Sequence, residues 1–144
     1  MNNPIVKASV RLESEILGLP VKTERDLVTE IRKGIPAICI LQIERLGFNK
    51  VTVIKTVGPR TTIERKIRSN SRLTPAQSNR LLRMVRIIGQ ANDTFGNPDK
   101  ARQWLERETT MFGADEAPLS LLDTDQGARL VEARLLQISH GMSA

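Results

Sequence analysis

The four residues from Thr74 to Gln77 carry the strongest folding signal in this chain, because together they predict the start of a long helix. Thr74 suits the N-cap position, where its hydroxyl accepts a backbone N–H, and Pro75 suits the first helical position, where no N–H is needed. Gln77 completes a capping box by reaching back to the N-cap amide. The helix is expected to end near Phe95 and Gly96. Its predicted buried face consists of Leu81, Leu82, Val85, Ile88 and Gly89.

Weaker start and stop signals of the same kind divide most of the remaining chain into helices. Predicted helices cover residues 25–33 after a Thr23 cap, 36–46 from Pro36, 50–57, 60–68, a segment opened by Asn97 and Pro98, and a final helix between Thr124 and Gly141. The β-branched residues of 50–57 also suit a strand, but the helical neighbours favour a helix. Residues 1–22 are expected to be a loosely ordered lead-in, with room for one short strand or helical turn, because Gly18 and Pro20 interrupt them. The fold class predicted is all-α.

The charge pattern divides the chain into regions of opposite sign. Between Lys55 and Arg86, nine Lys and Arg residues face a single acid, Glu64. Residues 23–96 hold 14 Lys and Arg against 6 Asp and Glu, whereas residues 97–144 hold 5 against 8. A basic block on helical sequence is typical of nucleic-acid binding, and the acidic C-terminal part indicates a second partner. We therefore expect a DNA-binding and dimerisation domain over 23–96 and a second domain over 97–144.

The predicted helices 50–57 and 60–68, joined by Gly58 and Pro59, resemble a helix-turn-helix. The match is imperfect. A usual helix-turn-helix has a small residue four positions before the turn glycine, whereas this chain has the bulky Ile54 there. The outward surface is therefore either a DNA-contacting face or a solvated scaffold that docks a partner. Candidate DNA-binding residues are Arg60, Thr61, Thr62, Arg65, Lys66 and Arg68, with Arg80, Arg83 and Arg86 as a flanking cationic stripe.

Several functional classes are disfavoured by what the chain contains. One cysteine, Cys39, and one histidine, His140, cannot build a disulfide or a tetrahedral zinc site, and Cys39 is expected to be an inert buried thiol. The chain has no nucleophile–base constellation and no glycine-rich phosphate loop. It also has no apolar run long enough to span a membrane and no signal-peptide pattern at residues 1–7. We expect a cytoplasmic non-enzyme without catalytic residues, cofactor, metal or membrane association.

The C-terminal half carries a specific pattern of residues in a fixed order. Pro118-Leu-Ser-Leu-Leu-Asp-Thr124 precedes Gly127-Ala128, Val131, Leu135 and a closing His140-Gly141, and Gln77 to Leu81 and Trp104-Leu105 come before it. This pattern resembles the Xre/ParS/MbcA family of bacterial antitoxins from Leu73 to the end, and more weakly back to Arg25. The resemblance implies a helix-turn-helix domain followed by a toxin-binding domain. The implied partner is a RES-domain toxin that consumes NAD or uses it to modify a metabolic enzyme.

In that family the C-terminal helix and tail block the toxin's NAD cleft, and the helix-turn-helix binds the operon's own promoter. We therefore expect operator DNA and a cognate toxin as partners, and a homodimer within a larger complex. The alternative is a stand-alone transcriptional regulator whose C-terminal half only dimerises. The candidate toxin-binding residues implied by the resemblance are Leu122, Asp123, Thr124, Arg134, Ile138, His140, Gly141 and Met142.

The same residue types permit structural roles at several of these positions. Asp123 and Asp125 also suit the positive end of a helix dipole, and His140 suits the negative end. Trp104 is typical of a core anchor. Gly127 lies in the first turn of a helix, where glycine is a poor helix former, so we expect another backbone to approach it closely. That backbone belongs either to residues 119–122 or to a partner.

Overall fold

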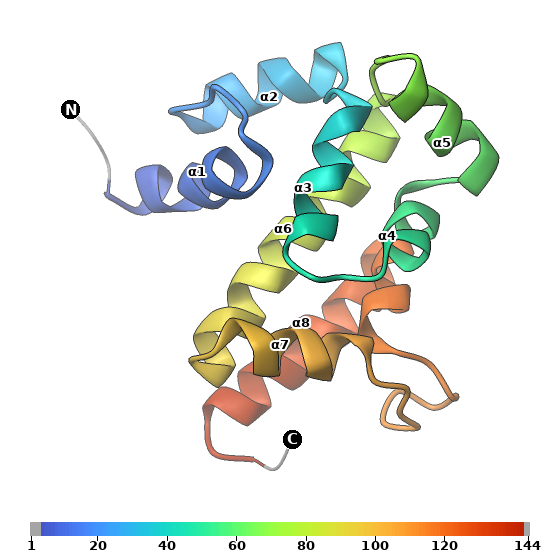
Figure 1. Cartoon of the computed structure of the whole chain (residues 1–144). Helices are drawn as coiled ribbons and strands as arrows, with labels where there is room; N and C mark the ends of the chain where they lie inside the picture. Colours follow the sequence, from blue (N-terminus) through green and yellow to red (C-terminus); the bar gives the residue numbers. More distant parts are fainter. Residues whose placement is uncertain (1–3, 143–144) are drawn as a thin grey trace.

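The computed structural model describes residues 4–142, and these residues form helices without any β-strand (Figure 1). The predicted all-α fold class is confirmed. Two isolated backbone bridges, between Pro36 and Arg72 and between Thr109 and Glu116, are the extended pairings in this part of the chain. The helices are α1 (Pro4–Leu17), α2 (Glu24–Lys33), η1 (Ala37–Cys39), α3 (Ile40–Arg45), α4 (Lys50–Val57), α5 (Arg60–Arg68), α6 (Pro75–Phe95), α7 (Pro98–Glu106), η2 (Pro118–Asp123) and α8 (Asp125–Ser139), where η denotes a 3₁₀ helix.

Helix α6 is the central element of the fold. It packs against α1, α2, α4, α7, α8 and η2, and it runs diagonally through the molecule in Figure 1. Its predicted start is confirmed, because the Thr74 hydroxyl accepts the Gln77 N–H at 3.1 Å and the Gln77 side chain accepts the Thr74 N–H at 2.9 Å. The predicted face is buried, and so are Met84 and Ile87. Neighbours on several sides therefore leave α6 little contact with solvent.

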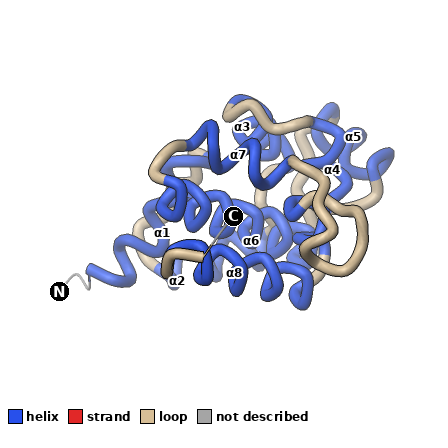
Figure 2. The backbone as a smooth tube through the Cα atoms, turned by 90° about the horizontal axis from the view of Figure 1, so that it is seen from below, coloured by secondary structure: helices blue, strands red, loops and turns tan. Residues whose placement is uncertain are grey.

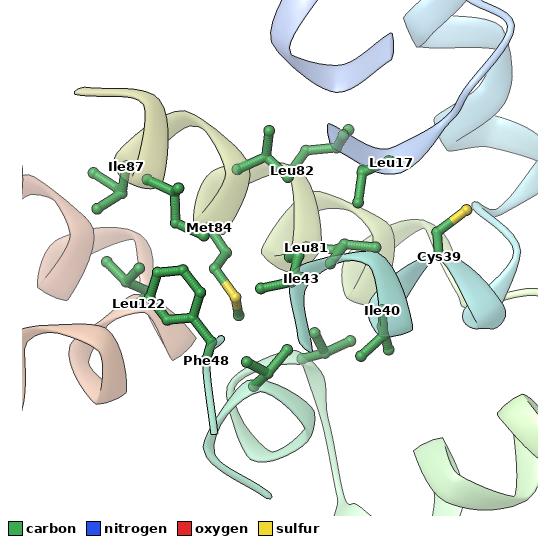
Figure 3. Close-up of a cluster of buried hydrophobic side chains, with 14 of the residues drawn as sticks. Leu17, Cys39, Ile40, Ile43, Phe48, Leu81, Leu82, Met84, Ile87 and Leu122 are labelled. Carbon is green, nitrogen blue, oxygen red and sulfur yellow. The ribbon is translucent and has the colours of Figure 1, made fainter. Parts of the chain in front are cut away.

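One hydrophobic core joins the N-terminal and C-terminal parts of the chain. Figure 3 shows Ile40 and Ile43 from α3, Phe48, and Leu122 from η2 gathered near Met84 and its neighbours on α6. Trp104 is 4% exposed and its ring lies 5.7 Å from that of Phe95, so the prediction of a core anchor is confirmed. Because both parts bury their apolar side chains in a single cluster, the placement of one depends on the other.

The prediction of a loosely ordered lead-in is wrong for residues 4–17, which form α1. Gly18, with a φ of 69°, ends this helix and does not prevent it. Val10 and Leu17, seven residues apart on one face, are each 2% exposed because α1 packs on α6. A Cβ at Gly89 would lie 2.5 Å from Leu12 Cδ1, so the glycine makes room for α1. Long-range packing of this kind has no local sequence signal.

The other predicted helices lie where the sequence places them. Thr23 caps α2 in a capping box with Asp26, and Asn97 caps α7. The segment 36–46 forms η1 followed by α3. Cys39 is buried, and burial raises the pKa of its thiol, which agrees with an inert side chain. Within residues 4–142, no helix has the length and hydropathy needed to cross a bilayer.

Gly127, at the corner between η2 and α8, lies very close to the backbone of a neighbouring segment. Gly127 is buried, and a Cβ there would collide with the carbonyl oxygen of Leu121. The close approach predicted at this glycine is therefore confirmed, and the approaching backbone belongs to this chain. The Thr124 hydroxyl accepts the Gly127 N–H at 2.9 Å, so the cap and the glycine act at the same corner.

Replacing Gly127 with Ala is expected to lower the free energy of unfolding by about 3 kcal/mol, because a rigid carbonyl cannot yield to the added methyl group. Gly89→Ala is the matched control. Its Cβ meets the flexible end of Leu12, and alanine is the better helix former, so a smaller loss is expected. Urea denaturation of both variants measures the difference, and equal losses would contradict the role assigned to the Leu121 carbonyl.

Candidate functional site

The candidate DNA-binding unit is the helix pair α4 and α5, which meet at Gly58 and Pro59. Gly58 has a φ of 177°, an extended conformation open to any residue. Space is tight here, because a Cβ would lie 3.1 Å from Ile63 Cδ1 and 3.3 Å from Gln77 Nε2. The bulky Ile54 is fully buried. Close approach of the two helices therefore occurs at Gly58, four residues later than the usual small residue.

All six candidate DNA-binding residues lie on α5, but they differ in what they contact. Arg60 is exposed and bonds Glu64 at 2.8 Å, and this hydrogen bond lowers the pKa of the Glu64 carboxyl. Lys66 is half-buried and donates to the Gln77 side chain at 3.0 Å, so it supports the capping box of α6. Arg65 and Arg68 are exposed, and within residues 4–142 their side chains form no hydrogen bond to a neighbour. Thr61 is exposed and Thr62 half-buried.

The arginines of α6 fasten neighbouring elements and do not form one free cationic stripe. Arg80 Nη1 donates to the Val57 carbonyl at 3.2 Å, at the end of α4. Arg83 Nη1 donates to the Leu122 carbonyl at 3.1 Å, and its Nη2 lies 4.0 Å from Asp125 Oδ1. Arg86 is exposed and its charge acts on the carboxyl of Glu13, whose pKa is nevertheless raised because that side chain is buried.

The corner between η2 and α8 holds three of the candidate toxin-binding residues, and they are not equivalent. Leu122 is fully buried in the core of this chain, so its side chain is not presented at the surface. Figure 3 shows it beside Phe48 and Met84. Thr124 is exposed, and its hydroxyl is occupied by the cap of α8. Asp123 is exposed. Asp125 bonds Arg129 at 3.0 Å, which lowers the pKa of its carboxyl.

The outward side of α8 carries large apolar side chains. Leu130 is 48% exposed, Leu136 is 56% exposed, and Met142 just beyond the helix is 52% exposed. The sequence prediction included Met142 but omitted both leucines. Their exposure could have been predicted from the sequence, because both leucines fall outside the buried stripe formed by Ala128, Val131 and Leu135. Leu130 and Leu136 are six residues apart, about 120° around the helix, so they lie on the two sides of the buried stripe. We call Leu130, Leu136 and Met142 the exposed apolar residues of α8.

The remaining candidate toxin-binding residues lie along the last turns of α8. Ile138 is half-buried and packs against the core. Arg134 is half-buried and donates to Gln137 at 3.2 Å. His140 is exposed and is the C-cap residue of α8, and Gly141 follows with a φ of 95°. The end of α8 and the helix α5 lie at different ends of the molecule, and Figure 2 shows α8 beneath α6.

Comparison with known proteins identifies this arrangement. The model of the antitoxin Xre/MbcA/ParS C-terminal toxin-binding domain matches residues 90–141. A protein named Antitoxin Xre from Photorhabdus laumondii is 30% identical over 129 residues, which cover 88% of this chain and 86% of that protein. This chain belongs to the Xre/MbcA/ParS antitoxin family.

Two further relatives extend the comparison. The protein named Antitoxin Xre from Pseudomonas putida is 29% identical over 127 residues, covering 88% of this chain and 79% of its own length. The Prs ADP-ribosylating antitoxin from Sphingobium is 27% identical over 134 residues, covering 83% and 81%. The matched toxin-binding segment of the antitoxin begins in the last turns of α6 and includes α7, η2 and α8. It contains Leu130 and Leu136, whereas α5 lies outside it.

Arg83 is expected to hold the η2–α8 corner of the antitoxin in place. Arg83→Met keeps the apolar stem and removes the guanidinium, so the Leu122 carbonyl loses its donor. We expect the free energy of unfolding to fall by about 1–2 kcal/mol. Arg129→Met removes the other partner of Asp125 from an exposed helical pair and is expected to cost only about 0.3–0.5 kcal/mol. Thermal and urea unfolding provide the measurement, and a larger loss for Arg129→Met would refute this role.

Proposed function

We propose that this antitoxin neutralises a RES-domain toxin without catalysis of its own, by covering the toxin's active-site cleft with α8 and the residues after it. The exposed apolar residues of α8 are the observation that carries the proposal. Leu130 and Leu136 on α8 and Met142 just beyond it are large apolar side chains exposed to water, and the two leucines lie within the segment matched to a toxin-binding domain. Apolar anchors that become buried dominate the energy of protein interfaces, and this is the role we propose for them.

The nature of the toxin is supported by the sequence resemblance and by one relative. The RES domain is implied by the order Pro118 to Thr124, Gly127-Ala128 and His140-Gly141. The Sphingobium relative carries ADP-ribosylation in its name. Since ADP-ribosyl transfer takes its group from NAD, an NAD-using toxin is the partner we propose. His140 and Met142 are exposed at the C-terminal end of α8. We propose that this end enters the cleft and blocks it, so the mechanism is steric occlusion.

We further propose that the antitoxin binds the promoter of its own operon through α5. Arg65 and Arg68 stand exposed on the outer side of α5, while Ile63 is buried beneath them. A cationic helix held on a buried apolar stripe suits phosphate and base contacts in a DNA groove.

We also propose a two-fold dimer, because the half-sites of an operator mirror the two-fold symmetry of the protein that binds it. Ile38 and Leu46, 42% and 47% exposed around α3, are the surface we propose for it. We propose a cytoplasmic location, because both proposed partners, the toxin and the operator DNA, are found there.

The alternative function is a stand-alone regulator whose C-terminal half only dimerises. The exposed apolar residues of α8 are compatible with both functions, since a second copy also covers apolar residues. Toxin binding distinguishes them. Under the alternative, the wild-type chain does not bind the toxin, and changes on α8 alter only the oligomeric state.

Leu136→Asp is expected to weaken toxin binding by at least a hundredfold, because it puts a carboxylate into the centre of the proposed contact. Leu46→Asp is the matched control, a leucine of similar exposure on the N-terminal half, and it should leave toxin affinity unchanged. Calorimetric titration with purified toxin and rescue of growth measure the two effects. Removal of residues 141–144 tests the tail separately, and full protection by that truncated antitoxin would contradict a role for the tail in occlusion.

Arg65→Ala combined with Arg68→Ala is expected to weaken operator binding and to reduce its salt dependence by about one unit of log–log slope for each lost phosphate contact. Lys66 is omitted from this test because its contact with Gln77 gives it a structural role. Lys100→Ala combined with Arg107→Ala removes the same charge from exposed positions around α7. Fluorescence anisotropy at several salt concentrations measures both pairs. Equal effects would mean that α5 has no specific role in DNA binding.

A further inference from the structure

An acid from the toxin-binding part of the chain lies beside the proposed DNA-binding helix. Asp123 is the last residue of η2, and it lines a cleft of about 380 Å³ together with Lys55, Arg60 and Arg80. The cleft opens at Pro59 and Arg60, where α5 begins. The sequence resemblance makes Asp123 a candidate for toxin contact. The structure brings it into the same cleft as the N-terminal end of α5.

The charges around this cleft are unequal and change along the surface. Lys55, Arg60 and Arg80 line the first cleft together with Asp123, while Arg60 also bonds Glu64 and Arg80 also donates to the Val57 carbonyl. A second cleft of about 330 Å³ shares Lys55 and Asp123 with the first and adds Glu116, so acids outnumber cations there. Packing of η2 against α4 holds Asp123 beside the helix pair. The basic surface of the helix pair therefore ends at Asp123.

Asp123 precedes the N-cap of α8, where it suits the positive end of the helix dipole, but it makes no specific contact in the part of the chain that the structure describes. Within residues 4–142 its carboxylate forms no hydrogen bond and no ion pair, and it is exposed. The cap of α8 is made by Thr124, and the acid in the first turn of α8 is Asp125. A helix N-terminus presents unpaired N–H groups and a positive dipole end, which attract a phosphate. A carboxylate fixed beside that end occupies the same electrostatic position as an incoming phosphate.

We propose that Asp123 is an electrostatic brake on DNA binding, which competes with a DNA phosphate for the cationic cleft at the start of α5. The inference rests on the proposed promoter binding. Its physical basis is Coulomb repulsion between the carboxylate and a phosphate across a partly solvated cleft, together with partial neutralisation of Lys55, Arg60 and Arg80. Because the interaction is screened by salt, the brake is strongest at low ionic strength.

The test compares full-length wild-type antitoxin with Asp123→Asn in fluorescence anisotropy, using a duplex from its own promoter and a scrambled duplex of equal length. The variant keeps the size of the side chain and removes its charge. We expect Asp123→Asn to bind both duplexes about three- to tenfold more tightly at 50 mM salt, with the gain largely lost at 500 mM salt. Equal gains on both duplexes are expected because phosphates carry no sequence information.

Asp115→Asn is the matched control, since it removes the same charge from an exposed residue that lines neither cleft. It should change the affinity less than twofold. In an Arg60→Ala background the gain from Asp123→Asn should shrink, because the two residues face the same cleft. Unchanged thermal unfolding confirms that the effect of Asp123→Asn does not come from a displaced α8.

The outcomes separate this inference from the proposed function. If wild type binds the promoter and Asp123→Asn binds it equally or more weakly, the brake is refuted and promoter binding stands. A gain equal to that of Asp115→Asn also refutes the brake, because net charge then explains it. If neither wild type nor Asp123→Asn binds either duplex at 50 mM salt, promoter binding itself is refuted, and the brake with it.

Discussion

Burial of α6 on several sides is the constraint on which the other elements depend. Its residues Leu81, Leu82, Met84 and Ile87 are fully buried, so every neighbouring helix is placed by contact with one continuous apolar surface. A helix enclosed in this way loses its stability if any neighbour is removed. The candidate DNA-binding pair, through α4, and the toxin-binding segment of the antitoxin therefore both pack against α6. Neither surface is an independent module in energetic terms.

The short 3₁₀ helix η2 connects these two functional halves. It packs against both α4 and α8, and its Leu122 side chain is fully buried. The guanidinium of Arg83 reaches the Leu122 carbonyl, and Gly127 lets α8 turn directly against Leu121. Few degrees of freedom remain at this corner. The same packing that positions α8 also carries Asp123 to the start of α5, so the proposed toxin-binding and DNA-binding surfaces share one structural support.

Prediction from sequence succeeded where the responsible interactions are local. The capping box at Thr74, the caps at Thr23, Asn97 and Thr124, and the glycine stops after α6 and α8 are all made by residues within four positions of one another. Prediction was wrong for α1, because its burial depends on the gap that Gly89 leaves on a helix far away in the chain. An apolar residue in a family motif, such as Leu122, can be either a contact or a core residue. Only the structure shows that its side chain is buried.

The sequence by itself determined that this antitoxin is all-α, where most of its helices begin and end, and that its family pattern lies in the last third of the chain. Helix caps, apolar periodicity and motif spacing operate within a few turns, so they can be read in one dimension. Only the tertiary structure decided which charges remain available and which are occupied. Arg80, Arg83 and Lys66 belong to the same basic block as Arg65 and Arg68, yet the first three fasten the fold while the last two face water. Charge acts through space, and a partner distant in sequence cannot be found before the chain is folded.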